Sequence, residues 1–385
     1  MNSRRTFLKS LPVLASLASF PKWAHAVGQF GTVQISGEDG MIVRSARFFD
    51  LETPVEYLNT WLTPAPHFFV RNHMHEPVEL EASEWRLSIS GEVEKPLILS
   101  LADLSKLETH SVVNTLECAG NGRGFQRPQV PGIQWGKGAI STAKFSGPRL
   151  RDVLQRAGLK TSGKHVMFRG LDEIPGKVPP FIRSIPIEKV LDSDTLLATH
   201  MNGASLTKHH GFPARALVPG WIGAASCKWL TEIKVLDSEF VGNFMNPGYR
   251  LPNQPVKPGE AMKPEDTHPV TGLNVKSVIV GPADGSHVKP GKIAVHGAAW
   301  AGEANIVKVE VSTDGGASWK PAMLGHEQAR YAWRLWRHEF AAKAGDYAIL
   351  SRATDSIGRV QPSTAVWNPS GYLYNAVDQV NIHVA

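Results

Sequence analysis

Cysteine is scarce in this sequence, which has only Cys118 and Cys227 among its 385 residues. That scarcity excludes a disulfide-dense scaffold, and two thiols are too few for an iron–sulfur cluster. The chain also lacks a Cys-x-x-Cys-His motif for covalent haem and the Gly-x-Gly-x-x-Gly dinucleotide fingerprint. If the protein handles electrons, a separate carrier must take them away.

Long apolar runs are also missing, because no segment beyond the N-terminus approaches the ~20 apolar residues of a membrane-spanning helix. The N-terminus itself has Arg4-Arg5 in the segment 3–9, an apolar stretch at 11–20, and Ala-His-Ala at 24–26. This pattern is typical of a twin-arginine signal peptide, residues 1–26, and predicts a periplasmic protein. The twin-arginine pathway carries folded proteins, which favours a chain that receives a complex cofactor before export.

Charge of one sign is not in large excess once that leader is removed. The whole chain has a formal net charge of +6, and the leader holds four cations and no acid, which leaves +2. A basic nucleic-acid-binding surface is therefore not supported. The 35 glycines and 27 prolines favour strands and turns over a helical bundle.

A proline-rich passage at 251–258 suggests a boundary between two domains, 40–255 and 262–385. The first domain alternates short β-like runs with helical candidates at 99–104 and 150–159, and therefore reads as α+β. In the first candidate Ser100 is placed to begin the helix, and Gly158 lies near the end of the second.

The second domain is predicted to be an immunoglobulin-like β-sandwich. Strands are expected at 275–280, 293–298, 306–312, 332–340 and 347–354. Val307, Val309 and Val311 alternate with charged residues, which predicts a strand with one wet face. Asp314-Gly315-Gly316 predicts a turn after that strand.

Cys118 lies between an apolar run and three alternating glycines, in Glu117-Cys118-Ala119-Gly120-Asn121-Gly122-Arg123-Gly124. Small residues let a bulky group approach the backbone, and a thiolate is a soft ligand that transition metals select. Arg123 could favour both a thiolate and an anionic substrate. The alternatives are a buried cysteine that acts as a small hydrophobe, and a disulfide with Cys227.

Three further segments combine cations, imidazoles and a phenol. Arg71 and His73 follow an apolar run, and are either site residues or an ordinary surface charge and polar side chain. Arg215 and Lys228 bound another apolar run and could hold a phosphate, unless that run is a buried strand with solvated ends. Tyr249 follows a Pro-Gly turn and either caps a hydrophobic surface or donates a hydrogen bond to a reacting oxygen.

The amino-acid sequences of these segments and their order along the chain resemble those of the sulfite oxidase family of molybdenum enzymes. The similarity extends from about Pro66 to the C-terminus. It is carried by Phe-Val-Arg-Asn-His at 69–73, Glu-Cys-Ala-Gly-Asn-Gly-Arg at 117–123, His-Gly-Phe-Pro-Ala-Arg at 210–215, and Lys-Trp-Leu at 228–230. The resemblance implies a sulfite-oxidase-type molybdopterin domain followed by an immunoglobulin-like dimerisation domain.

Carried over by position, the resemblance implies that Cys118 is the sole protein ligand of molybdenum, beside a pterin dithiolene and oxo groups. Arg71 and Arg123 would hold the anionic substrate, and Tyr249 would lie beside the reactive oxygen. The positions that would hold the molybdopterin and its phosphate are His73, His210, Arg215, Ser226 and Lys228.

The implied activity is oxidation of sulfite to sulfate, with electrons passed to an external carrier such as a c-type cytochrome, by a homodimer. One departure bears on the substrate: the family's common Trp-Asn-Leu-Arg-Gly reads Trp367-Asn368-Pro369-Ser370-Gly371 here. Loss of one charge-assisted hydrogen bond to an anion costs ~1.5–3 kcal/mol. Weak sulfite binding or a different substrate is therefore expected.

Three other functions are compatible with the sequence. A sulfane-type dehydrogenase that acts on protein-bound reduced sulfur would accommodate the missing arginine. A methionine-sulfoxide reductase of related fold is a second alternative, although the C-terminal sandwich argues against it. The third is a non-enzymatic secreted binding protein built on an immunoglobulin-like module.

Overall fold

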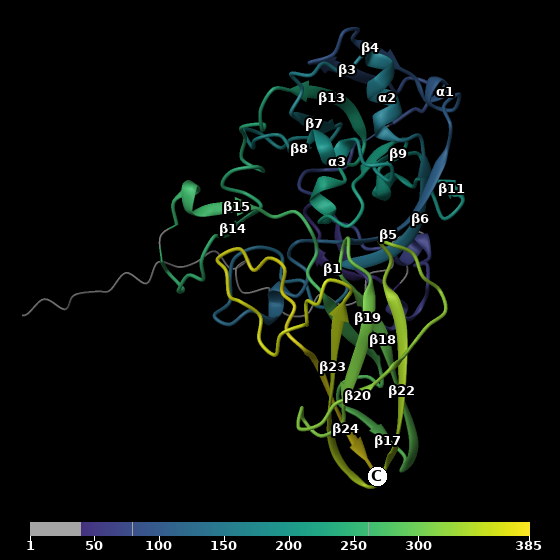
Figure 1. Cartoon of the computed structure of the whole chain (residues 1–385), viewed down its shortest axis with the longest axis vertical. Helices are drawn as coiled ribbons and strands as arrows, with labels where there is room; N and C mark the ends of the chain where they lie inside the picture. The colour runs from purple at the N-terminus through teal and green to yellow at the C-terminus, as the bar shows by residue number, and fades with distance from the viewer. Residues whose placement is uncertain (1–39, 79, 261) are drawn as a thin grey trace, which may run out of the picture.

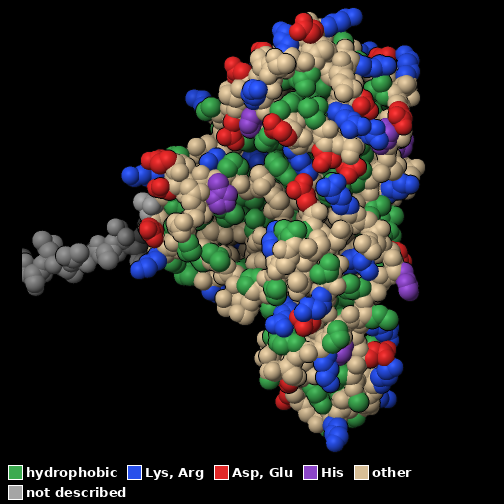
Figure 2. Space-filling model, viewed as in Figure 1, with side chains coloured by type: hydrophobic (Ala, Val, Ile, Leu, Met, Phe, Trp, Pro, Cys, Tyr) green, Lys and Arg blue, Asp and Glu red, His purple; other side chains and the backbone are tan. Residues whose placement is uncertain are grey.

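The computed structural model describes residues 40–78, 80–260 and 262–385. The predicted signal peptide, 1–26, lies outside these residues. Figure 1 shows a mixed domain at the top of the view and a β-sandwich below it, with the strands β1 and β5 at the junction. Over the face in Figure 2, acidic and basic side chains are intermixed on both domains. Within the described ranges, no helix is long and apolar enough to cross a membrane.

The first domain contains a five-stranded sheet in the order β4-β3-β13-β7-β8. Its strands are β3 (Leu87–Gly91), β4 (Leu97–Leu99), β7 (His165–Gly170), β8 (Ile182–Pro186) and β13 (Leu230–Leu236). Strand β13 pairs in parallel with β3, and the other neighbours are antiparallel. The strand β13 therefore carries the chain from the segment that ends at Lys228 into the middle of the sheet.

A second sheet of this domain has the order β11-β10-β6-β5. It is built from β5 (His110–Glu117), β6 (Ile140–Gly147), β10 (His200–Met201) and β11 (Ala204–Ser205). Three two-stranded ribbons complete the strands outside the sandwich: β1 (Ile42–Ser45) with β2 (Asp50–Glu52), β9 (Leu196–Ala198) with β12 (Arg215–Leu217), and β14 (Arg250–Pro252) with β15 (Thr267–Pro269). The second sheet matters for function because β5 ends directly before Cys118.

The helices are short: α1 (Leu101–Leu104), α2 (Leu150–Ala157) and α3 (Ile187–Val190). Both helical predictions are confirmed. Ser100 caps α1 in a reciprocal capping box with Asp103, which satisfies backbone donors that the first turn leaves free. Gly158 ends α2 in the left-handed conformation that glycine adopts without steric cost.

In the second domain two sheets pack face to face, and all of their strand pairs are antiparallel except β17 with β24. One has the order β16-β18-β22-β21 and the other β17-β24-β23-β19-β20. Their strands are β16 (Lys276–Gly281), β17 (Ser286–Val288), β18 (Gly291–Trp300), β19 (Ile306–Ser312), β20 (Lys320–Pro321), β21 (Met323–Leu324), β22 (Arg334–Ala342), β23 (Gly345–Asp355) and β24 (Asp378–Val384). The buried apolar side chains of both sheets form one core, as the sandwich prediction requires.

One detail of the strand prediction is wrong. Val309 and Val311 are buried, but Val307 is 55% exposed. The pairing of β19 with β23 shifts register between Ile306 and Lys308. Such an irregularity turns the side chain between these two residues to the other face of the sheet. The inward-facing alternation of Val309 and Val311 therefore does not extend to Val307.

The two domains meet at a buried ion pair. The Glu117 Oε1 atom lies 3.5 Å from Lys276 Nζ, and both side chains are 6% exposed. The indole of Trp300 donates a hydrogen bond of 2.8 Å to Glu117 Oε2. Asn121 donates another, of 2.9 Å, to Oε1. Residues of both domains thus supply the hydrogen-bond and ion-pair partners of the Glu117 carboxylate at the end of β5.

We expect Lys276→Met to destabilise the protein strongly. Removal of one partner leaves the carboxylate of Glu117 buried without its counter-charge, which typically costs about 3–5 kcal/mol. Urea unfolding measures the change. The matched control is Lys292→Met, because Lys292 pairs with Glu339 but is 72% exposed, and an exposed pair contributes roughly 0–1 kcal/mol. Equal effects of the two substitutions would contradict this interpretation.

Candidate functional site

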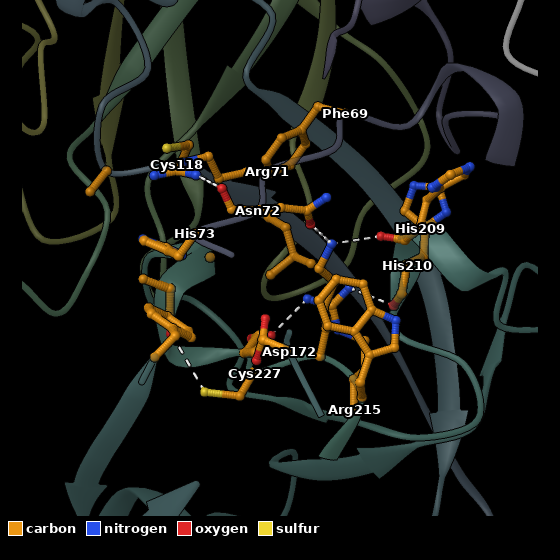
Figure 3. Close-up of a pocket in the computed structure, with 18 of the residues that line it drawn as sticks. Phe69, Arg71, Asn72, His73, Cys118, Asp172, His209, His210, Arg215 and Cys227 are labelled. Carbon is orange, nitrogen blue, oxygen red and sulfur yellow. Dashed lines mark hydrogen bonds between the residues drawn. The ribbon is translucent and has the colours of Figure 1, made fainter. Parts of the chain in front are cut away.

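A cavity lies where the end of β5 meets the segments 68–73, 209–228 and Tyr249. Most of the predicted site residues line it: Arg71, His73, Cys118, His210, Arg215, Ser226, Lys228 and Tyr249. In Figure 3, Cys118 and Arg71 lie at one end, and His210 and Arg215 lie at a distance from them. The fold therefore brings together side chains separated by up to 178 positions in the chain.

Cys118 is fixed by its backbone and keeps its thiol at the cavity. Its amide donates to Ala139 O and its carbonyl accepts from the amide of Asn121, both at 2.9 Å. The side chain is 9% exposed. Burial raises the pKa of the Cys118 thiol, while Arg71 and Arg123 oppose that rise. Both cysteines are free thiols, so the disulfide alternative is wrong.

Arg71 is a partly buried cation with a fully buried counter-ion. Its Nη1 atom lies 3.2 Å from Asp50 Oδ1, and the same nitrogen donates to the carbonyl of Asn72. Burial alone would lower the pKa of Arg71, but the carboxylate of Asp50 raises it above its usual value. Asp50 itself is fully buried. Arg71 is thus held at the cavity as a permanent positive charge.

His73 and Tyr249 form a hydrogen-bonded pair beside Arg71. The His73 Nε2 atom bonds to the Tyr249 hydroxyl, and the imidazole stacks on Phe181 at 3.9 Å between centroids. Burial, followed by the charges of Arg71 and Arg183, lowers the pKa of His73 well below its usual value. Burial also raises the pKa of Tyr249. The imidazole is therefore neutral and the phenol protonated at neutral pH.

Arg215 and Lys228 supply positive charge in another part of the cavity. Arg215 donates to the carbonyls of His210 at 3.0 Å and Ser226 at 2.8 Å. Burial lowers the pKa of Arg215 to about 10 and that of Lys228 to about 8. Lys228 donates to the side chain of Asn72 and, at 2.7 Å, to the carbonyl of His209. These are not the solvated strand ends of the alternative interpretation.

The other two predicted cofactor residues are held by protein partners. The ring nitrogens of His210 lie 2.6 Å from Thr207 Oγ1 and 3.2 Å from the carbonyl of Phe68. Since the carbonyl can only accept, Nε2 carries the proton and Nδ1 accepts from the threonine hydroxyl. Ser226 Oγ accepts from the amide of Val218 at 3.0 Å, which leaves its hydroxyl hydrogen able to donate.

Arg123 does not line the cavity. Its Nε donates to the carbonyl of Ser370 at 2.8 Å and its Nη1 to the carbonyl of Ile133 at 3.0 Å. The guanidinium lies directly behind Gly120, where an added Cβ would approach its Cζ to 2.7 Å. The glycine at 120 is therefore required so that this cation can approach the Cys118 loop closely.

Asn72 and Asp172 are among the polar residues of the cavity that sequence reasoning missed. Asp172, which follows β7, lines it, and burial raises its pKa to about 6, against the lowering effect of Lys228. Asn72 accepts from Lys228 and donates to Glu76 Oε1 at 2.9 Å. Asp172 lies two residues after the end of β7, and an acidic residue just beyond a largely apolar strand is a sequence signal that could have indicated it. The role of Asn72 depends on contacts with residues far away in the chain.

The residues present fit a molybdopterin group. A thiol at the cavity can become the thiolate ligand of a soft metal when the metal displaces its proton. Within the described residues, the buried Nε of Arg215 has no hydrogen-bond partner. The partners of its other nitrogens are neutral carbonyls, so these contacts leave the charge of Arg215 uncompensated. An anionic phosphate would satisfy both the orphaned donor and that charge.

Comparisons with known proteins agree with this fit. Residues 73–244 match the oxidoreductase molybdopterin binding domain, and residues 267–385 match the Mo-co oxidoreductase dimerisation domain. The chain is 38% identical over 360 residues to the human mitochondrial sulfite oxidase, covering 89% of this chain and 66% of that protein. It is 39% identical over 355 residues to the chicken sulfite oxidase, covering 88% and 76%.

A solved structure covers almost the whole chain. The sulfane dehydrogenase SoxCD from Paracoccus pantotrophus superposes with a TM-score of 0.77 at 27% identity, over 98% of this chain and 96% of that one. The fold and the cavity thus define a molybdopterin-binding oxidoreductase. More specifically, the chain belongs to the sulfite oxidase family of molybdenum enzymes. The non-enzymatic binding protein is thereby excluded.

We expect Asp172→Asn to stabilise the cofactor-free protein increasingly as pH rises above the ordinary carboxyl pKa of 3.8, with the full effect reached above about pH 6. The carboxyl has a pKa of about 6 in the folded protein, above the ordinary value of 3.8. The folded state therefore binds the extra proton between these values, and the stability contributed by Asp172 falls as pH rises through that window. Thermal unfolding should show a higher Tm for the variant at pH 7.5 and no difference at pH 3.5. A constant offset at both pH values would contradict the assigned cause.

We expect Arg215→Met to lose molybdopterin, because a charge-assisted hydrogen bond to phosphate contributes about 1.5–3 kcal/mol, equivalent to roughly 10–100-fold in affinity. Pterin fluorescence after oxidative release, together with metal analysis, measures the cofactor content. The control is Lys208→Met, because Lys208 is an exposed cation whose Nζ donates to the carbonyl of Val78. The same cofactor content in both variants would show that Arg215 does not hold the phosphate.

Proposed function

We propose that this protein oxidises sulfite to sulfate and passes the two electrons to an external carrier such as a c-type cytochrome. Water supplies the fourth oxygen of sulfate, and two protons leave with the electrons. The bound molybdenum centre supplies the oxygen-atom transfer and accepts the electrons. The proposal is supported by the sulfite oxidases that the chain resembles, of which it spans 66% and 76% of the length.

The observation that carries the proposal is a thiol beside a fixed cation in a largely buried cavity. Cys118 and Arg71 both line it, and the charge of each affects the pKa of the other. A thiolate suits a soft metal, and a guanidinium suits an oxyanion such as sulfite. Low exposure strengthens this attraction, because water screens buried charges weakly.

His73 and Tyr249 position a hydrogen-bond donor next to these two residues. Because the phenol stays protonated, its O–H group can donate to a substrate oxygen while its oxygen accepts from His73 Nε2. The neutral imidazole of His73 adds no charge that would compete with Arg71 for the anion. The chain's own contribution is therefore to bind and orient the oxyanion and to keep a protonated phenol beside it.

A second candidate is oxidation of a sulfane sulfur carried by a partner protein. Two observations favour it: the superposition with the sulfane dehydrogenase SoxCD over almost the entire chain, and Ser370 at the position where the family commonly has arginine. Without that cation the pocket has less positive charge for a free dianion. A sulfur on a larger carrier would depend less on this charge.

We further propose that the protein works as a periplasmic homodimer. The leader with Arg4 and Arg5 supports export by the twin-arginine pathway. The match of residues 267–385 to a dimerisation domain supports the homodimer. Folding before export would allow the molybdopterin to be inserted while the protein is still in the cytoplasm.

We expect the metal-loaded protein to reduce ferricytochrome c with sulfite, and Cys118→Ser to have no turnover above background. Arg71→Gln should raise KM for sulfite by roughly 10–100-fold, the equivalent of one charge-assisted hydrogen bond. Arg47→Gln, at an exposed position, is the control. Sulfite and a protein-bound persulfide are compared as electron donors to ferricytochrome c, and methionine sulfoxide is tested separately as an electron acceptor with an added reductant. Turnover of the persulfide alone would replace the proposal with the second candidate.

A further inference from the structure

Two buried arginines and two tyrosines form a continuous series of ring contacts next to the cavity, which we call the Arg–Tyr–Tyr–Arg stack. The guanidinium of Arg183 lies over the Tyr249 ring at 4.8 Å. The Tyr249 ring stacks on Tyr372 at 5.3 Å with an interplanar angle of 4°. Arg123 lies over the Tyr372 ring at 5.4 Å. The stack therefore has one cation at each end and the site tyrosine inside it.

Arg183 is an unusual residue for its position. It lies in β8, is 2% exposed, and has a buried Nε without a partner among the described residues. Its Nη1 donates to the carbonyl of Phe244. Within the described ranges no carboxylate forms an ion pair with it. A buried cation without a direct counter-ion is costly, so stability alone does not explain an arginine at this position.

The guanidinium of Arg183 contacts the segment that carries Tyr249 at two places. The carbonyl of Phe244 fixes the start of that segment, and the ring of Tyr249 fixes its end. The neighbouring amide of Ser184 contacts the sulfur of Met245 at 3.4 Å. Tyr249 itself has φ +56, a conformation that costs a non-glycine residue energy and persists only when the surroundings enforce it.

Tyr372, the second tyrosine of the stack, comes from the second domain. Asn368 accepts from the amide of Tyr372 and donates to its carbonyl, both at 2.9 Å. The next residue, Leu373, donates its amide to the carbonyl of Ala119 at 2.8 Å. Tyr372 is thus fixed to the loop of Cys118, and its ring presses on Tyr249 from the second domain.

We propose that Arg183 is a positioning residue for Tyr249, and that it acts through the Arg–Tyr–Tyr–Arg stack. The stack sets the direction of the Tyr249 hydroxyl toward His73 and the substrate. In this arrangement the second domain contributes the ring of Tyr372, which stacks on Tyr249 and lies two positions after Ser370. The functional part of this inference rests on the proposed oxidation of a sulfur oxyanion, but the stack itself does not.

The test uses 3-fluorotyrosine and fluorine NMR on the full-length protein, because the chain has six tyrosines and their signals can be assigned with single Tyr→Phe variants. Arg183→Met should shift the signals of Tyr249 and Tyr372 and leave that of Tyr347 unchanged. Arg183→Lys keeps the charge and should give smaller shifts. These measurements need no turnover, so they separate failure of the stack from failure of the proposed function.

The kinetic arm uses the loaded enzyme and the substrate that it turns over. Misplacement of a reacting group by about 1 Å costs on the order of 100-fold, so Arg183→Met should lower kcat by about tenfold to 100-fold, with a smaller change in KM. Arg183→Lys should recover part of the loss. Tyr372→Phe should keep the stack and the rate, and Tyr372→Leu should lose both.

Arg169→Met on the adjacent strand β7 is the matched control, because Arg169 is 50% exposed. The proposal is overturned if Arg183→Met leaves the two tyrosine signals and kcat as Arg169→Met does, or if Arg183→Lys recovers nothing. Circular dichroism checks the fold of each variant. If Arg183→Met does not fold, Arg183→Lys and Tyr372→Leu give the same decision, since wild-type signals and kcat in both would refute the stack.

Discussion

The carboxylate of Glu117 is buried at the junction of the two domains, and the position of the active thiol depends on how that charge is satisfied. Lys276 and Trp300 of the second domain and Asn121 of the Cys118 loop provide its partners. Because an unpartnered buried carboxylate is very unfavourable, β5 can end at this place only when the sandwich is docked against it. The next residue is Cys118. The second domain therefore takes part in placing the metal ligand.

The cavity contains cations that the carboxylates of the protein balance only in part. Arg71 has Asp50 as a counter-ion, but the direct partners of Arg215 are carbonyls, and burial lowers the pKa of Lys228 to about 8. Desolvated cations of this kind reduce the stability of the cofactor-free fold. An anionic cofactor recovers that loss on binding, because a ligand that binds only the folded state stabilises it. Cofactor affinity and fold stability are thus coupled through the same side chains.

Local signals in the sequence were enough for the elements that local physics controls. Ser100 and Gly158 mark helix ends through capping, which depends on a few neighbouring residues. Contacts between distant segments were not accessible in this way. Val307 is exposed because of a register shift set by a partner strand, and Arg123 lies behind the Cys118 loop because carbonyls at Ile133 and Ser370 hold it there. The family resemblance collected the cavity residues, but it did not reveal Arg183.

The loop 368–373 shows why substrate choice in this chain cannot be assigned to the first domain alone. Its backbone accepts from Arg123 through Ser370 and donates to Ala119 through Leu373, so it covers the Cys118 loop. A cation on this loop would add charge for a small dianion, and the ring of Tyr372 on the same loop stacks on Tyr249. The loop thus bears both on the charge near the substrate and on the position of the Tyr249 hydroxyl. Divergence in a loop of the dimerisation domain can therefore change specificity while the metal ligand and the cofactor cations stay in place.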